Sequence, residues 1–289
     1  MNYIIKSEKL TVTIDGMGAE LISVKGADGH EYMWDANEQY WDAHAPVLFP
    51  ACGRTLDNTY TLSGKSYEMH AHGFAREYPF TVAEKSDDSV TLVLKENEQT
   101  KKNYPFDFTL TAEYKVVNNS LFVNYTVQNN DKKVMPYMLG WHPGFVLEGD
   151  EPIGKFALKF DDKESVSWYP LQNGCFVRPY GENYSLSNSE YALNEEEIYA
   201  NDTMIFTETG DHALLYSPKS AHSLDFSWSK NLPYFCIWKE TESDARFICL
   251  EPWSDVPGGG DEPENFDTKK MSRLAPGKSE CYSYTLKFM

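Results

Sequence analysis

Two short motifs place a titratable side chain among aromatic residues, directly after a strand-like run. His142 lies in the sequence GWHPGF at 140–145, and Glu251 lies in LEPW at 250–253. An apolar setting shifts pKa values, so an imidazole and a carboxylate held in this way could serve as a general acid and a general base. The alternative for each residue alone is structural: His142 would satisfy a hydrogen bond near a strand end, and Glu251 would lie at the surface.

A cluster of polar residues precedes these motifs. His70 and His72 are followed by Glu77 in a spacing that matches the first metal-binding motif of cupins, which places two imidazoles and a carboxylate around a first-row metal. The second cupin motif does not follow, so we favour a site without metal. In that interpretation His72 and Arg54 bind the oxygens of a neutral ligand, because a guanidinium group presents a planar fork of donors.

Two further residues have both a structural and a functional interpretation. Arg76 is expected to pair with a neighbouring acid, Glu77 or Glu68, rather than to bind a ligand. Asp202 directly precedes the strand-like residues 203–206, and it is either a turn or cap residue or an acceptor for the hydroxyl groups of a ligand. The sequence leaves both interpretations of Asp202 open.

The composition restricts the class of partner. The 289 residues include 26 basic and 44 acidic side chains, and the formal net charge of −18 argues against DNA, RNA and anionic membrane surfaces. Aromatic residues make up 15% of the chain, and their rings suit both half-buried strands and stacking on the apolar faces of sugars. A small uncharged molecule is compatible with this composition.

Cysteine usage and the N-terminal segment predict a cytoplasmic protein. The five cysteines are odd in number and show no paired spacing, which is typical of reduced thiols: Cys52, Cys175, Cys236, Cys249 and Cys281. The first residues lack the basic segment and apolar run of a signal peptide, and no segment approaches the length of a membrane span. We therefore expect no association with a membrane.

Alternation of apolar and polar residues predicts an all-β fold. The clearest case runs through residues 106–116, an Asn-Asn turn and residues 121–127, and predicts a long hairpin. Residues 282–288 predict a closing strand, whereas helical periodicity is limited to residues 193–199. No linker rich in Pro, Gly or Ser divides the chain, so residues 1–289 are expected to form one large, sandwich-like β domain with a few short helical turns.

Taken together, these motifs resemble the aldose 1-epimerase (galactose mutarotase) family. The hairpin that leads into GWHPGF at 140–145, the segment around His72 and the strand that ends in Glu251-Pro-Trp are similar to its hallmarks, and the resemblance is nearest to the LacX-type branch. It implies a β-supersandwich with a shallow sugar cleft, which needs no cofactor and no metal. It also implies that His142 is the general acid and Glu251 the general base.

The same resemblance assigns the other candidates to the sugar. His72 and Arg54 match the sugar-positioning His and Arg of the family, and Asp202 matches its hydroxyl-binding Asp. The chain has Trp-His-Pro-Gly-Phe where better-known galactose mutarotases have an Asn-His-x-x-Phe type signature, and it lacks the usual His after Asp202. The sequence therefore leaves open which aldohexose is bound, and it does not reveal the oligomeric state.

The implied activity is the interconversion of the α and β anomers of an aldose through ring opening. An imidazole near its ordinary pKa of about 6.5 is well matched to this chemistry, and a neighbouring carboxylate would favour its charged form. Two alternatives remain open. One is a sugar-binding or sensing protein without turnover, and the other is a hexose-phosphate mutarotase that would use Arg54, Arg76 and Lys65 to bind the phosphate.

Overall fold

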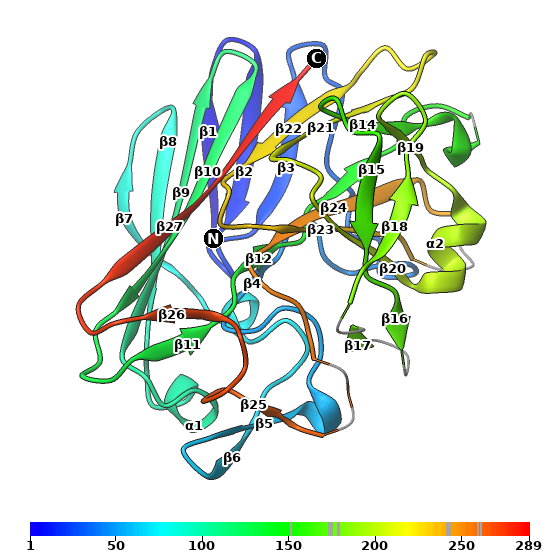
Figure 1. Ribbon diagram of the computed structural model, residues 1–289. Coiled ribbons are helices and arrows are strands. Elements are labelled where there is room, and N and C mark those ends of the chain that lie inside the picture. The colour runs from blue at the N-terminus through cyan, green and yellow to red at the C-terminus, as the bar shows by residue number, and fades with distance from the viewer. Residues whose placement is uncertain (151, 173–175, 178–179, 241–243, 259, 261) are drawn as a thin grey trace.

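Two large antiparallel β-sheets form the body of the protein, and smaller sheets surround them (Figure 1). The computed structural model describes residues 1–150, 152–172, 176–177, 180–240, 244–258, 260 and 262–289. Helix within these residues is limited to α1 (Thr100–Asn103), α2 (Glu195–Asn201) and the 3-10 turns Leu56–Asn58, Ala75–Glu77 and Ile153–Lys155. The prediction of an all-β sandwich with a few short helical turns is confirmed.

The larger of the two sheets, here called the outer sheet, has nine strands among the described residues. Their order is β19 (Glu190–Ala192), β14 (Ala157–Phe160), β21 (His212–Tyr216), β22 (Leu224–Trp228), β27 (Ser279–Phe288), β10 (Ser120–Asn129), β9 (Phe108–Val117), β8 (Ser89–Lys95) and β7 (Thr81–Lys85). The predicted hairpin is β9–β10, which turns at Asn118 and Asn119. Asn118 has a φ of 52°, a left-handed conformation that Asn tolerates better than most residues. The closing strand is β27.

The second large sheet, here called the inner sheet, contains the motifs around His142 and Glu251. Its order is β18 (Glu182–Ser185), β15 (Ser165–Trp168), β20 (Thr203–Thr207), β23 (Tyr234–Trp238), β24 (Phe247–Trp253), β12 (Gly140–Trp141) and β4 (Val47–Leu48), and β13 (Gly144–Val146) also pairs with β24. Gly140 lies opposite Trp253 in the β12–β24 pair. This register brings His142, directly after β12, beside the part of β24 that contains Glu251.

Four smaller sheets complete the described fold. They are β1 (Asn2–Lys6) with β2 (Leu10–Asp15) and β3 (Leu21–Gly26); β25 (Glu264–Asn265) with β5 (Thr59–Leu62) and β6 (Lys65–Glu68); β11 (Met135–Tyr137) with β26 (Ser272–Leu274); and β16 (Leu171–Gln172) with β17 (Phe176–Val177). The first of these is the N-terminal sheet. Its last strand, β3, leads into the loop that reaches β4.

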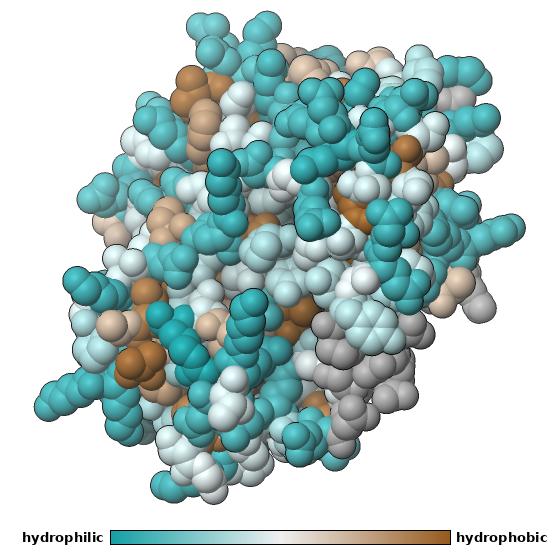
Figure 2. All heavy atoms as spheres, viewed as in Figure 1, coloured by the Kyte–Doolittle hydropathy of each residue, from teal (hydrophilic) through white to brown (hydrophobic). Residues whose placement is uncertain are grey.

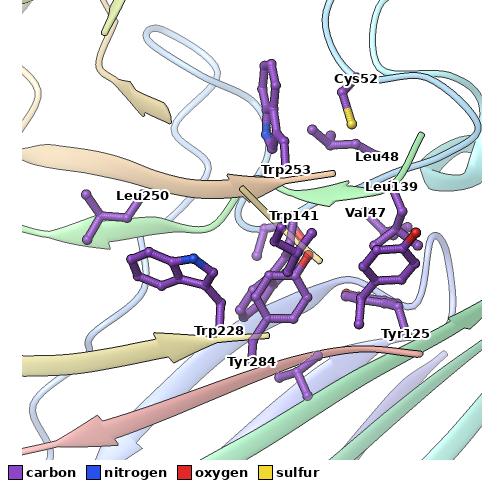
Figure 3. Packing of buried hydrophobic residues seen from close by; sticks show 14 of the residues in the cluster. Val47, Leu48, Cys52, Tyr125, Leu139, Trp141, Trp228, Leu250, Trp253 and Tyr284 are labelled. Carbon is purple, nitrogen blue, oxygen red and sulfur yellow. The ribbon is translucent and has the colours of Figure 1, made fainter. Parts of the chain in front are cut away.

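Side chains of β12 and β24 alternate between the core, which lies between the two large sheets, and the opposite face of the inner sheet. Trp141 is fully buried, and its ring centroid lies 5.2 Å from that of Tyr284 on β27 (Figure 3). Leu250 enters the same core from β24, whereas Trp253 lies on the other side of that strand. Successive side chains of a strand point to opposite faces, so Glu251 faces away from the core together with Trp253.

The short helix α2 positions Asp202. It begins at Glu195, where the side chain of Asn194 accepts a hydrogen bond from the backbone N–H of Glu197 and satisfies one of the free donors of the first turn. The helix lies within two residues of the predicted segment 193–199 and ends at Asn201. Asp202 then turns the chain into β20 with a φ of 60°.

The described residues contain free thiols and no helix that could cross a membrane. No helix among them combines the length and the apolar character needed to cross a membrane. Cys52, Cys236, Cys249 and Cys281 are free thiols, and Cys175 lies outside the described residues. Hydrophilic side chains cover most of the face shown in Figure 2, and hydrophobic ones occur there in separate small groups.

Candidate active site

A cavity of about 410 Å³ opens on the inner sheet beside the junction of β12 and β24. Its lining includes the five residues that the sequence singled out: Arg54, His72, His142, Asp202 and Glu251. The inner sheet and its flanking loops therefore bring together side chains that are far apart in the chain.

His142 and Glu251 form a buried pair in this cavity. Their Nε2 and Oε1 atoms lie 3.3 Å apart, and only 8% of His142 and 1% of Glu251 are exposed. Glu251 comes from the middle of β24, where it lies opposite Cys236 of β23. Nδ1 of His142 and the Glu251 oxygens make no hydrogen bond of normal geometry with the described residues. Such unsatisfied buried groups are costly, and here they are available to a ligand.

Burial acts on the two members of this buried pair in opposite directions. It raises the pKa of the Glu251 carboxyl well above its usual value; the nearby indole of Trp253 opposes this shift and Asp202 adds to it. It lowers the pKa of the His142 imidazole well below its usual value, and His72 and Arg76 lower it further. The pKa of His142 therefore does not lie near the ordinary value that would suit the chemistry best, because desolvation is the largest influence on it. Burial thus favours the neutral form of both groups, a protonated carboxyl and an unprotonated imidazole.

His72 is held by the loop that contains Gly53. The backbone N–H of His72 donates to the Gly53 carbonyl at 2.8 Å, and the backbone N–H of Gly53 donates to Nδ1 of His72 at 3.2 Å. Nδ1 is thus an acceptor, so the neutral ring carries its proton on Nε2. Burial, followed by the charges of Arg76 and Arg54, lowers the pKa of His72 to about 3. His72 is therefore a neutral hydrogen-bond donor.

The conformation of His72 depends on its neighbour. His72 has a φ of 66° and Gly73 a φ of 75°. A Cβ atom at position 73 would lie 2.2 Å from the carbonyl oxygen of Phe49, so only glycine fits there. The strained turn places the imidazole edge-on to His142, with the ring centroids 5.4 Å apart.

The cupin-like spacing does not form a metal site. The exposed His70 lies 3.3 Å from Glu68, and neither His70, His72 nor Glu77 belongs to a potential metal-binding group of the described residues. One such group does lie in the cavity, where Cys249 approaches the buried pair. Burial raises the pKa of the Cys249 thiol well above its usual value, so it is protonated and poorly suited to bind a metal.

The surroundings of Arg76 differ from the prediction. Arg76 lines the cavity, and no ion pair joins it to Glu68 or Glu77 among the described residues; the predicted surface pair was wrong. Asp202 ends α2, in line with its structural interpretation, and it also lines the cavity, so its role toward a ligand stays a prediction. Burial raises its pKa, while Arg54 and a hydrogen bond from Trp238 oppose that shift.

Sequence reasoning missed most of the aromatic wall of the cavity. The ring centroids of Trp41 and Trp238 lie 5.0 Å and 5.4 Å from that of His142, and the Trp253 ring lies 5.7 Å from that of His72. Trp253 belongs to the LEPW motif that the sequence analysis singled out, whereas Trp238 at the end of β23 was given no role there. Trp41 lies in the irregular loop before β4, where no periodicity indicates its direction.

Comparison with known proteins identifies the family. The family model of the aldose 1-epimerases matches residues 1–286. The chain belongs to the aldose 1-epimerase family. It is 30% identical over 303 aligned residues to the protein LacX of Lactococcus lactis subsp. lactis, with 99% of both chains covered. This similarity agrees with the resemblance to the LacX-type branch.

Two solved structures are similar over the whole chain. The galactose mutarotase related enzyme of Lactobacillus acidophilus is 31% identical to this chain, with a TM-score of 0.92 and with 100% of this chain and 97% of that one covered. A galactose mutarotase-like protein of Lactobacillus casei shares 30%, with a TM-score of 0.93 and both chains fully covered. The protein is therefore a mutarotase-type enzyme with a sugar substrate.

His72 is expected to stay neutral, with its proton on Nε2, at every pH above about 4, because burial and two arginines hold its pKa at about 3. Nitrogen chemical shifts of the histidine rings, followed by NMR as the pH is lowered, measure this directly. Titration of His72 near the ordinary histidine value of about 6.5 would contradict the assigned tautomer.

Proposed function

We propose that this protein interconverts the α and β anomers of a neutral aldohexose, with Glu251 as general base and His142 as general acid. The observation that supports the proposal best is the buried pair itself. An imidazole and a carboxylate lie 3.3 Å apart at the wall of a cavity of about 410 Å³, and their remaining polar atoms are unsatisfied. A cavity of this size accommodates one sugar ring.

The proposed reaction needs only these two groups. The Glu251 carboxylate takes the proton of the anomeric hydroxyl group, a C=O bond forms at C1, and the bond between C1 and the ring oxygen breaks. The electron pair of that bond stays on the ring oxygen, which takes a proton from the His142 imidazolium. Rotation about C1–C2 then presents the other face of the aldehyde, and the two groups reverse their roles as the ring closes.

The shifted pKa values suit this exchange. Before ring opening the pair holds one proton on His142, and afterwards it holds one proton on Glu251, so its net charge stays at zero. Burial favours the neutral form of each residue, raising the pKa of Glu251 and lowering that of His142. A carboxylate with a raised pKa is a stronger base and an imidazolium with a lowered pKa is a stronger acid, which suits the roles proposed for the two groups.

The other cavity residues are suited to hold the sugar. His72 offers an Nε2–H donor, Arg54 a planar set of donors and Asp202 an acceptor, and together these groups match hydroxyl groups. Trp41 and Trp238 provide flat apolar surfaces on which the hydrophobic face of a pyranose can stack. Binding by donors, acceptors and rings requires no charge on the ligand.

The charges of the cavity favour a neutral sugar over a hexose phosphate. Arg54 and Arg76 line it, but so do three acidic side chains besides Glu251: Asp42, Asp202 and Glu240. Lys65, the third cation considered for a phosphate, lines a different cavity beside β6. Acidic groups that outnumber the two cations would repel a phosphate dianion.

Polarimetry of freshly dissolved α-glucose, α-galactose and glucose 6-phosphate tests this conclusion. The protein is expected to accelerate the approach to anomeric equilibrium for at least one of the two neutral sugars, and more than for the phosphate. Faster turnover of the phosphate would favour the hexose-phosphate alternative. Binding of a neutral sugar without acceleration would favour a sensing protein.

Replacing Glu251 by Gln, or His142 by Asn, is expected to lower kcat by about 10²–10⁴-fold while leaving the KM for the sugar within a few-fold of the wild-type value. Each new side chain keeps hydrogen-bonding capacity but cannot exchange a proton. Initial rates by polarimetry measure the effect, and His70→Asn, in the exposed part of the loop that contains His72, is the matched control. Wild-type rates in Glu251→Gln would return Glu251 to a structural role.

The wild-type rate is expected to follow a bell-shaped pH profile. At low pH the buried pair takes up a second proton, so Glu251 is no longer a base; at high pH it loses its single proton, so His142 is no longer an acid. Because the two groups are coupled, each limb of the profile reports a pKa of the pair and not of one residue. The profile of kcat against pH in the wild type and in His142→Asn measures this. An unchanged basic limb in the variant would exclude His142 as the acid.

A further inference from the structure

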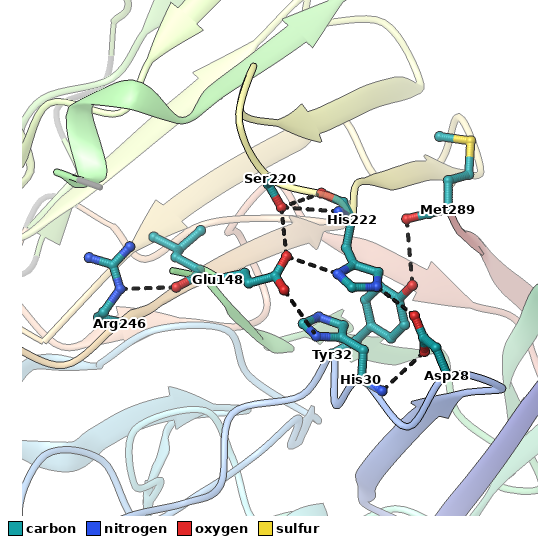
Figure 4. A network of polar contacts seen from close by, with 9 residues as sticks. Asp28, His30, Tyr32, Glu148, Ser220, His222, Arg246 and Met289 are labelled. Carbon is teal, nitrogen blue, oxygen red and sulfur yellow. Dashed lines mark hydrogen bonds and ion pairs between the residues drawn. The ribbon is translucent and has the colours of Figure 1, made fainter. Parts of the chain in front are cut away.

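A second group of titratable side chains lies outside the sugar cavity, where three sheets meet (Figure 4). Asp28 and His30 follow β3 of the N-terminal sheet. Glu148 follows β13 of the inner sheet, and Ser220 and His222 precede β22 of the outer sheet. None of them lines the cavity that contains the buried pair, so mutarotation does not account for them.

The group is tightly organised around His222. Its Nδ1 lies 2.8 Å from Oε2 of Glu148, and its Nε2 lies 2.8 Å from Oδ2 of Asp28. The His30 ring stacks on the His222 ring at 3.8 Å, with 6° between their planes, and Nδ1 of His30 lies 3.8 Å from Oε1 of Glu148. One ligand atom each from His30, Glu148 and His222 lies within 4.8 Å of the others.

The electrostatics of the group favour a cation. Two carboxylates, on Asp28 and Glu148, face two imidazoles that stack too closely for both to carry a charge without strong repulsion. The group therefore keeps a net negative charge. The nearest basic side chain drawn in Figure 4, Arg246, directs its Nε to the backbone carbonyl of Leu147 and not to Glu148.

We propose that His30, Glu148 and His222 form a binding site for a divalent transition-metal ion such as Zn²⁺. Two imidazole nitrogens and one carboxylate are a common ligand set for zinc, with water at the remaining position. The ion replaces the proton between His222 and Glu148, and the His30 ring turns out of the stack to direct Nδ1 at it. The side chains are accessible to an ion in solution, since His30, His222 and Glu148 are 15%, 17% and 36% exposed.

Asp28 supplies an outer partner for one of the proposed ligands. A ligating His usually donates its other ring N–H to a carboxylate or carbonyl, which fixes the ring and strengthens the ligand. Asp28 has this position on Nε2 of His222, while Ser220 donates a hydrogen bond to the Glu148 carboxylate at 3.0 Å. His222 and Glu148 are therefore oriented before an ion binds.

His212 provides a comparison within the same chain. It also lies between two carboxylates, with Nδ1 3.0 Å from Asp161 and Nε2 3.2 Å from Asp225. No second His joins it, and it belongs to no potential metal-binding group of the described residues. His212→Gln is thus the matched control for the loss of a His that is paired with two acids.

Calorimetric titration of the chelator-treated, full-length protein with Zn²⁺ tests the proposal. One equivalent is expected to bind, and His30→Gln and His222→Gln should abolish this event. Asp28→Asn should weaken it about 10–100-fold, as loss of an outer partner does at other zinc sites. His212→Gln and Glu251→Gln should bind as the wild type does. Absence of stoichiometric binding, or equal binding by all variants, would overturn the proposal.

A second measurement covers variants that fold poorly. Because an ion bound only by the folded state stabilises it, Zn²⁺ should raise the Tm of the wild type and of His212→Gln but not that of His30→Gln. Melting curves in chelator establish that His30→Gln is folded. Its turnover of α-glucose or α-galactose should equal that of the wild type, so the site and the proposed activity can fail separately. A Zn²⁺-induced rise in the Tm of His30→Gln would overturn the assignment.

Discussion

The contact between His142 and Glu251 is the constraint on which the account of this enzyme depends. Two groups that water would normally solvate lie 3.3 Å apart with almost no exposure. Desolvation disfavours a charge on either one, but a single shared proton satisfies both as an ion pair or as two neutral groups. In the proposed mechanism, the desolvation that makes the pair costly to bury also makes Glu251 a stronger base and His142 a stronger acid.

Paired strands of the inner sheet hold the two residues in place. β12, β23 and β24 are paired strands, and their alternation sends Trp141 and Leu250 into the core while His142 and Glu251 leave it. Trp141 also donates its indole N–H to the Ala45 carbonyl at 2.9 Å, which ties β12 to the chain beside β4. Displacement of one strand would separate the pair, so stability of the core and geometry of the site are linked.

The sequence predicted the fold class and the central hairpin because strand alternation and an Asn-Asn turn are local signals. It also singled out five of the residues that line the cavity, largely through the resemblance to a family. It failed for Arg76 and did not indicate the lowered pKa of His142, since both depend on how deeply the folded chain buries a group. The cluster around His222 has no sequence signal at all, because its members come from three separate loops.

The most direct test of the central claim is the mutarotation rate of the double variant Glu251→Gln/His142→Asn, measured by polarimetry beside the two single variants. Groups that exchange one proton act as a unit, so removing the second should cost little once the first is gone. We expect the double variant to be about as slow as the slower of the two single variants. Losses that multiply would show that the two residues act independently, which would contradict it.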